Sequence, residues 1–112
     1  VNGDGTFYIA YLFATLAGVS KVGTVTHSGS STDVACGFSA GARFVMLKRI
    51  DATGDWYFWD SVRGIVSGND PYLLFNTNAA QVTNTDYIDP LASGFQISGD
   101  FTDGDYIFYA IA

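Results

Sequence analysis

The sequence predicts an all-β fold, an antiparallel two-sheet β-sandwich of jelly-roll-like arrangement with short loops. All eleven acidic residues are Asp and none is Glu, and Asp favours turns whereas Glu favours helices. Thirteen Gly residues add further chain reversals. The apolar segments are rich in Val, Ile and aromatic residues, which strands prefer. With 112 residues, the chain suffices for one domain with one core.

Three strands are expected in the first third of the chain. Residues 7–14 follow the turn-like Gly3-Asp4-Gly5 and are almost continuously apolar, which predicts a strand buried on both faces. Residues 20–26 alternate loosely between polar and apolar positions, and residues 32–38 form a short strand that small residues close.

The clearest element is a hairpin over residues 44–60. Residues 44–50 are apolar until Lys48 and Arg49, where the strand reaches water. Residues 51–55 supply the Asp and Gly chemistry of a tight connection. The aromatic run 56–59 then returns antiparallel, and we expect this hairpin to be the spine of the core.

The second half of the chain predicts three more strands. Residues 78–82 fit a helical turn or an irregular stretch equally well. Asp89-Pro90 predicts a break in regular structure, because proline lacks a backbone donor and restricts the residue before it. The expected strands are residues 72–76, 94–98 and 106–112.

Composition and charge exclude several functional classes. A chain that is 48% hydrophobic is not disordered, and its longest apolar run falls short of the ~18 residues that span a bilayer. A net charge of −6 argues against nucleic-acid binding. The single cysteine, Cys36, excludes internal disulfides and thiolate zinc sites, and His27 is the sole histidine. We therefore expect no membrane insertion, no metal and no cofactor.

The two ends of the chain carry similar segments. Residues 8–14 and 106–112 are identical at four of seven positions at an offset of 98 residues, and each follows an Asp-Gly pair. Two strands of one sheet with similar requirements explain this, and so does tandem repetition. In the second interpretation, residues 1–14 hold the closing strand of a preceding repeat and residues 15–112 form a complete sandwich domain. One of the apolar end strands must then pair with a neighbouring repeat or subunit.

Residues 41–64 contain a Lys-Arg pair followed by Asp-x-x-Gly-Asp-Trp and Trp-Asp-Ser-x-Arg. This segment resembles a repeat domain of tail-fibre and related virion structural proteins of tailed bacteriophages, notably marine and cyanobacterial ones. Residues 74–80, 93–97 and 106–112 agree in order, so that the resemblance covers nearly the whole chain. The chain departs from the family at residues 41–43, where such domains often carry a proline, and in the shorter loop 99–105.

The resemblance implies a non-enzymatic structural or adhesive role in a virion, in a phage tail or another surface projection assembled in the host cytoplasm. Implied partners are other copies of the chain, adjacent repeats or virion proteins, and host-surface glycans. By analogy with fibres we expect a homo-oligomer, with a trimer favoured. A capsid decoration or an extracellular filament subunit remains an alternative place for the same structural role.

The residues that could serve in catalysis or metal binding are more simply explained as structural residues. Paired carboxylates can hydrolyse glycosides, and crowded ones can hold calcium, but turn formation and salt bridges to Arg63 or Lys48 are preferred. No spacing selects a Ser–His–Asp triad around His27, and Cys36 fits a small buried hydrophobe. We assign no catalytic or metal-binding residue. The carboxylates considered are Asp51, Asp55 and Asp60 around the hairpin, and Asp100, Asp103 and Asp105 before the last strand.

Three aromatic residues, Trp56, Tyr57 and Trp59, carry the functional signal of the sequence. On a strand, Trp56 and Phe58 face one side while Tyr57 and Trp59 face the other. One pair must belong to the core, and the other is exposed or packed against another subunit. Exposed aromatic rings anchor interfaces or stack on sugars. Core or subunit packing is preferred, and a carbohydrate-binding or glycan-depolymerising domain is the alternative.

Overall fold

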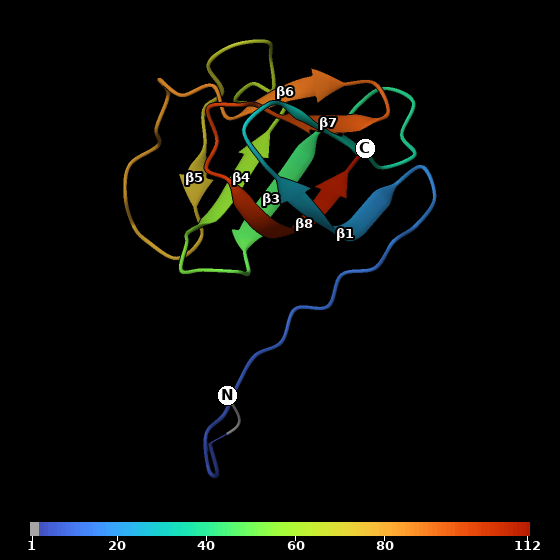
Figure 1. Ribbon diagram of the computed structural model, residues 1–112. Coiled ribbons are helices and arrows are strands. Elements are labelled where there is room, and N and C mark those ends of the chain that lie inside the picture. The colour runs from blue at the N-terminus through green and yellow to red at the C-terminus, as the bar shows by residue number, and fades with distance from the viewer. Residues whose placement is uncertain (1–2) are drawn as a thin grey trace.

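The computed structural model describes residues 3–112, which form eight strands and no helix (Figure 1). Two antiparallel sheets lie against each other, so the predicted all-β sandwich is confirmed. Over this range, no helix has the length and apolarity needed to cross a bilayer. The strands are β1 (Ser20–His27), β2 (Thr32–Ala35), β3 (Phe44–Arg49), β4 (Trp56–Asp60), β5 (Leu73–Leu74), β6 (Ile88–Leu91), β7 (Gly94–Ile97) and β8 (Gly104–Ile111).

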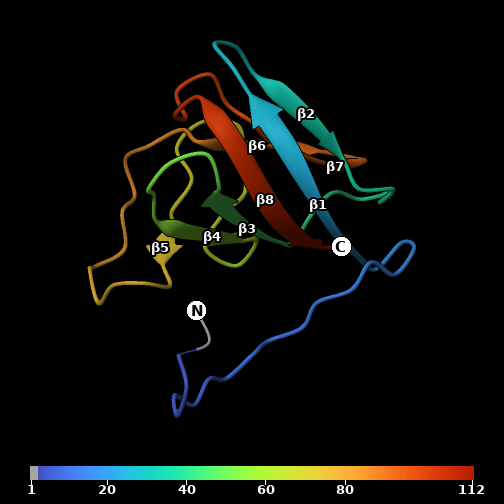
Figure 2. The same cartoon turned by 60° about the horizontal axis from the view of Figure 1, so that its bottom comes forward.

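The larger sheet has the strand order β1-β8-β3-β4-β5 (Figure 2). The last strand of the chain, β8, lies at its centre and pairs along its length with β1 on one side and β3 on the other. The β3–β4 hairpin is confirmed, with Phe44 opposite Asp60 and Lys48 opposite Trp56. The edges of this sheet are β1 and the two-residue strand β5.

The smaller sheet has the order β2-β7-β6 and corrects one prediction. Asp89 and Pro90 do not break regular structure but lie inside β6, where Pro90 is opposite Phe95. The physical reason is that β6 is an edge strand. Proline lacks a backbone donor, which an edge tolerates because one side of the strand pairs with nothing in its sheet.

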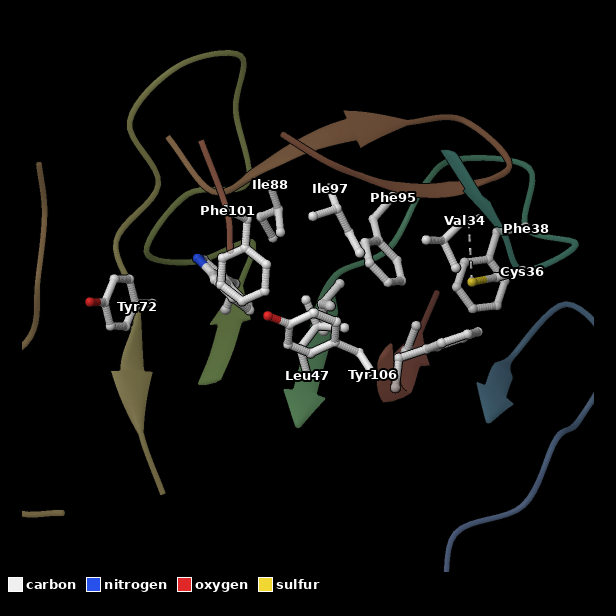
Figure 3. Packing of buried hydrophobic residues seen from close by; sticks show 14 residues of the cluster. Val34, Cys36, Phe38, Leu47, Tyr72, Ile88, Phe95, Ile97, Phe101 and Tyr106 are labelled. Atoms are coloured by element: carbon white, nitrogen blue, oxygen red, sulfur yellow. Dashed lines mark hydrogen bonds between the residues drawn. The ribbon is translucent and has the colours of Figure 1, made fainter. Parts of the chain in front are cut away.

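The core lies between the two sheets and follows the alternation of their strands. Val45 and Leu47 of β3 and Trp59 of β4 point inward and are 0% exposed. Leu47 and Tyr106 of the larger sheet point toward the side chains of the smaller sheet (Figure 3). Phe95 of β7 meets Phe108 of β8 edge-on at 5.6 Å between ring centroids. The hairpin therefore forms much of one wall of the core.

Several strands are shorter than expected because loops take up their ends. The predicted strand 32–38 stops at Ala35, and the backbone amides of Cys36 and Phe38 both donate to the carbonyl of Ser93. Only Leu73–Leu74 of the predicted strand 72–76 is a strand. Residues 78–82 adopt the irregular alternative, and Val82 exchanges two backbone hydrogen bonds with Tyr72.

Residues 7–14, hereafter the arm, correct another prediction. The arm is neither buried on both faces nor part of a sheet; it extends from the start of β1 as an unpaired segment outside the two sheets (Figures 1 and 2). It joins β1 through a hydrogen-bonded turn, in which Thr15 Oγ1 accepts from the amide of Val22 at 3.1 Å. The central position that its sequence suits is filled by β8. The first two residues of the predicted 1–14 segment lie outside the described residues.

Candidate functional site

The three aromatic residues singled out in the sequence do not share one surface. The alternation of β4 turns Tyr57 and Trp59 into the core and Trp56 to the opposite side. Trp59 is 0% exposed and stacks on Tyr57 at 5.8 Å, and burial raises the pKa of the Tyr57 hydroxyl to about 12. Trp56 is 37% exposed, so it alone of the three is available to a ligand or partner.

The side of the larger sheet that faces away from the smaller sheet, hereafter the outer face, is apolar. One row of directly opposed side chains crosses all five strands of this sheet. Antiparallel sheets that face water on one side normally alternate between apolar and polar positions, and this row breaks the rule. Its members, from β1 to β5, are Val22, Tyr109, Met46, Phe58 and Leu73.

Aromatic rings outside the row pack on two of its members and extend this surface. Phe58 stacks on Phe75 at 4.1 Å between ring centroids, and Phe75 is 56% exposed. Phe13 of the arm stacks on Tyr109 at 4.3 Å. The Arg63 guanidinium lies 5.6 Å from the centre of the Phe58 ring, a cation–π arrangement.

A groove of about 690 Å³ lies between the arm and the outer face. Alternate arm residues line one wall, and side chains from β3, β4 and the segment after β5 line the other. Asn76 supplies the polar contact at the rim, since its side chain accepts from the amide of Trp56 at 2.9 Å and donates to Asp55. The lining residues are Ile9, Tyr11, Phe13, Met46, Trp56, Phe75 and Asn76.

The family model described as a domain of unknown function, DUF7483, matches residues 1–112. The chain belongs to this family. No curated protein and no solved structure matches the chain. The DUF7483 match covers the arm as well as the sandwich.

The carboxylates around the β3–β4 hairpin contact neighbouring side chains and backbone amides. Asp51 pairs with Arg49 at 2.6 Å, and this guanidinium lowers the pKa of the Asp51 carboxyl. Asp60 accepts from the amides of residues 62 and 63 and forms an ion pair with Arg63. Asp55 accepts from Asn76. These contacts explain Asp51, Asp55 and Asp60 as turn and loop residues.

Of the carboxylates near the start of β8, Asp103 precedes the strand and Asp105 lies within it. Asp103 accepts from the amide of Gly29 at 2.7 Å, and Asp105 accepts from the hydroxyl of Thr26 at 2.6 Å. Asp103 thereby joins the turn between β1 and β2 to the segment that leads into β8, and Asp105 links opposed residues of the paired strands β1 and β8. Among residues 3–112, no three His, Cys or acidic side chains gather closely enough to hold a metal ion.

His27 and Cys36 both lie inside the sandwich. His27 ends β1, is 1% exposed, and its Nδ1 lies 2.9 Å from the hydroxyl of Thr32. Its Nε2 makes no hydrogen bond within the described part of the chain, so no Ser–His–Asp arrangement forms around it. Cys36 is buried as expected, and burial raises the pKa of its thiol.

Sequence reasoning missed one buried acidic residue, Asp70. Its side chain is 0% exposed, and its Oδ1 accepts from the amide of Val66 at 2.6 Å. Its own amide donates to the carbonyl of Thr85 at 2.9 Å, which joins two long loops. Burial raises the pKa of this carboxyl to about 6. The signal was present in Asn69-Asp70-Pro71, a triplet that predicts a turn but not its burial.

Proposed function

We propose that this chain is a non-enzymatic structural module of a virion, a tail-fibre or spike unit of a tailed phage. Its role is to build the fibre and to contact the host surface. The observation that carries the proposal is the apolar outer face together with the exposed arm. Contiguous exposed apolar surface of this kind marks interaction sites in soluble proteins. The resemblance of residues 41–64 to phage fibre repeats supports placing that interaction in a virion.

The exposure of the arm argues for assembly. Leu12 is 93% exposed, Ile9 84% and Tyr11 80%, although each side chain gains about 1.5–3 kcal/mol when it is fully buried. Partners of this module are other copies of the chain, adjacent repeats or other virion proteins. The fibre analogy favours a trimer. A capsid decoration or a filament subunit would use the same surfaces.

Self-association of the intact chain tests this proposal, and two valines allow a matched comparison. Val22 lies on the outer face, whereas Val62 lies in the loop after β4 and is 95% exposed. We expect the wild-type chain to form an oligomer in sedimentation experiments. We expect Val22→Lys to weaken it at least about tenfold, which corresponds to about 1.4 kcal/mol, and Val62→Lys to leave it unchanged. A wild-type monomer at high concentration, or equal effects of the two substitutions, would contradict the proposal.

A second candidate function, glycan binding, is favoured by the ring of Trp56. Trp56 and Phe75 are both exposed and line the same groove, with the Asn76 amide beside them. Aromatic faces flanked by a hydrogen-bonding amide suit a sugar ring. Binding of host-surface polysaccharide that Trp56→Ala abolishes, while Val62→Ala retains it, would support this candidate. Release of reducing sugar would instead indicate a depolymerase.

A further inference from the structure

The arm and β8 correspond residue by residue, and β8 shows how such a strand is oriented in this fold. Tyr106, Phe108 and Ala110 of β8 point into the core and are 2%, 4% and 0% exposed. The residues between them point to the outer face. At the 98-residue offset, Tyr8, Ala10 and Leu12 of the arm correspond to the three inward residues, and Ile9, Tyr11 and Phe13 to the three outward ones.

The arm already presents its outward set to this domain. Ile9, Tyr11 and Phe13 line the groove over the outer face, and Phe13 stacks on Tyr109. The inward set, Tyr8, Ala10 and Leu12, does not line this groove. If the arm were the central strand of a sheet in a second domain, the outer face of that second sheet would therefore lie against the outer face of this domain.

The inward residues of the arm do not fit the core of an identical copy. In this domain the Phe108 ring lies against Gly23, where an added Cβ would sit 2.8 Å from the ring. Ala10 in place of Phe108 would leave a cavity there. Leu12 in place of Ala110, which is 0% exposed, would overpack the neighbouring position. The acceptor of the arm must carry a larger residue where this domain has Gly23.

We propose that the arm is the central strand of a second domain of this fold with a different core sequence, packed with its outer face against the outer face of this domain. This proposal rests on the proposed assembly function and names the partner of the same surface. It accounts for three features together: the β8-like sequence of the arm, the direction of its side chains, and the apolar row across the sheet. The acceptor of the arm is therefore a related domain, whereas the outer face that stays uncovered in the isolated chain is the surface through which identical copies associate.

A two-domain protein tests this pairing with the full chain intact. Residues 15–98 are placed directly before residues 1–112, so that residues 1–7 replace the loop 99–105 and the arm can enter the added domain in the β8 position. Two versions differ only at position 23 of the added segment, which is Gly in one and Val in the other. Amide hydrogen exchange of residues 8–14 is the readout, because pairing in a sheet slows it.

We expect the arm to exchange at least about tenfold more slowly when the added segment carries Gly23→Val. Ala10→Phe in the arm should reverse this order, since the larger ring fits only against glycine. Rapid exchange of the arm in both versions would overturn the proposal. Equal effects of Ala10→Phe in both versions would overturn its size complementarity. Neither result depends on self-association of the 112-residue chain, which tests the proposed function separately.

The face-to-face packing has its own readout in Trp56. With Trp56→Phe in the added segment, the intact chain contributes the only Trp56, and Trp59 is buried in the core. Acrylamide should quench this tryptophan less in the two-domain protein than in the chain alone, because the second sheet covers it. Unchanged quenching beside a protected arm would contradict the packing of the two outer faces.

Discussion

The arm and β8 share a sequence pattern and have opposite environments. Tyr106 of β8 is 2% exposed and its hydroxyl donates to the carbonyl of Thr102 at 2.7 Å. Its counterpart Tyr8 is 57% exposed. The difference is pairing, because β8 lies between β1 and β3 while the arm has no strand beside it in the described residues. An apolar, aromatic sequence thus permits a central strand, and neighbouring strands decide whether one forms.

The largest expected effect comes from truncating the two equivalent tyrosines. Tyr106→Ala should lower the free energy of unfolding by about 3–5 kcal/mol, because it removes a buried ring and a hydrogen bond. Tyr8→Ala should change it by less than about 0.5 kcal/mol in the monomer. Urea denaturation measures both. Similar losses for the two variants would show that the arm already contributes to the fold of the domain.

The two faces of β3 sharpen the comparison within one strand. Leu47 is 0% exposed on the inner face, and Met46 is half-buried on the outer face. Leu47→Ala should cost about 2–5 kcal/mol, and Met46→Ala clearly less in the monomer. A change of less than about 0.5 kcal/mol for Leu47→Ala would mean that the inner face has been assigned to the wrong side.

Asp70 allows a buried ionisable group to be compared with an exposed one. Burial raises the pKa of the Asp70 carboxyl from an ordinary 3.8 to about 6. The folded state then holds this proton more tightly than the unfolded state. Its contribution to stability is present below about pH 4 and is lost as pH rises through about 6. The loss amounts to about 2–3 kcal/mol. We expect Asp70→Asn to remove this slope in urea titrations between pH 4 and 7.

Asp51 provides the matched control for that experiment. Its pKa is lowered by the hydrogen bond from Arg49, so its contribution to stability is lost as pH falls rather than as pH rises. Asp51→Asn should therefore change the pH dependence in the opposite sense. A wild-type stability that rises steadily from pH 4 to 7, unaltered by Asp70→Asn, would contradict the burial of this carboxyl as a free acid.

Among the strand residues compared, Trp56 has the smallest expected effect on stability. This ring is 37% exposed on the outer face, so Trp56→Ala should cost the monomer about 1 kcal/mol or less. Its effect on assembly should be larger, because exposed aromatic rings anchor interfaces. A loss of several kcal/mol in the monomer would place Trp56 in the core instead.

The local sequence pattern was sufficient to predict part of this structure. The β3–β4 hairpin follows from alternation and from turn residues adjacent in sequence, and the strand bounds agree within a residue. The arm was predicted wrongly because its sequence holds no information about which strand occupies the central position. Pro90 was predicted wrongly because edge and centre of a sheet are set by strand order.

The candidate site was predicted in part. Alternation correctly divided Trp56 and Phe58 from Tyr57 and Trp59, but it could not say which pair faces the smaller sheet. That choice depends on residues far along the chain, such as Phe101, whose ring lies 5.2 Å from that of Tyr57. The apolar row on the outer face likewise requires the register of all five strands. Burial of Asp70 depends on its contacts with two separate loops, which no local motif encodes.

Amide hydrogen exchange of the dilute 112-residue chain tests most directly whether the arm depends on a partner for its structure. Residues 8–14 and 106–112 can be followed in the same sample, so that each β8 amide serves as the reference for its arm counterpart. We predict that the β8 amides exchange only through global unfolding, while the arm amides exchange at close to unprotected rates. Arm amides as protected as those of β8 in the monomer would contradict the account.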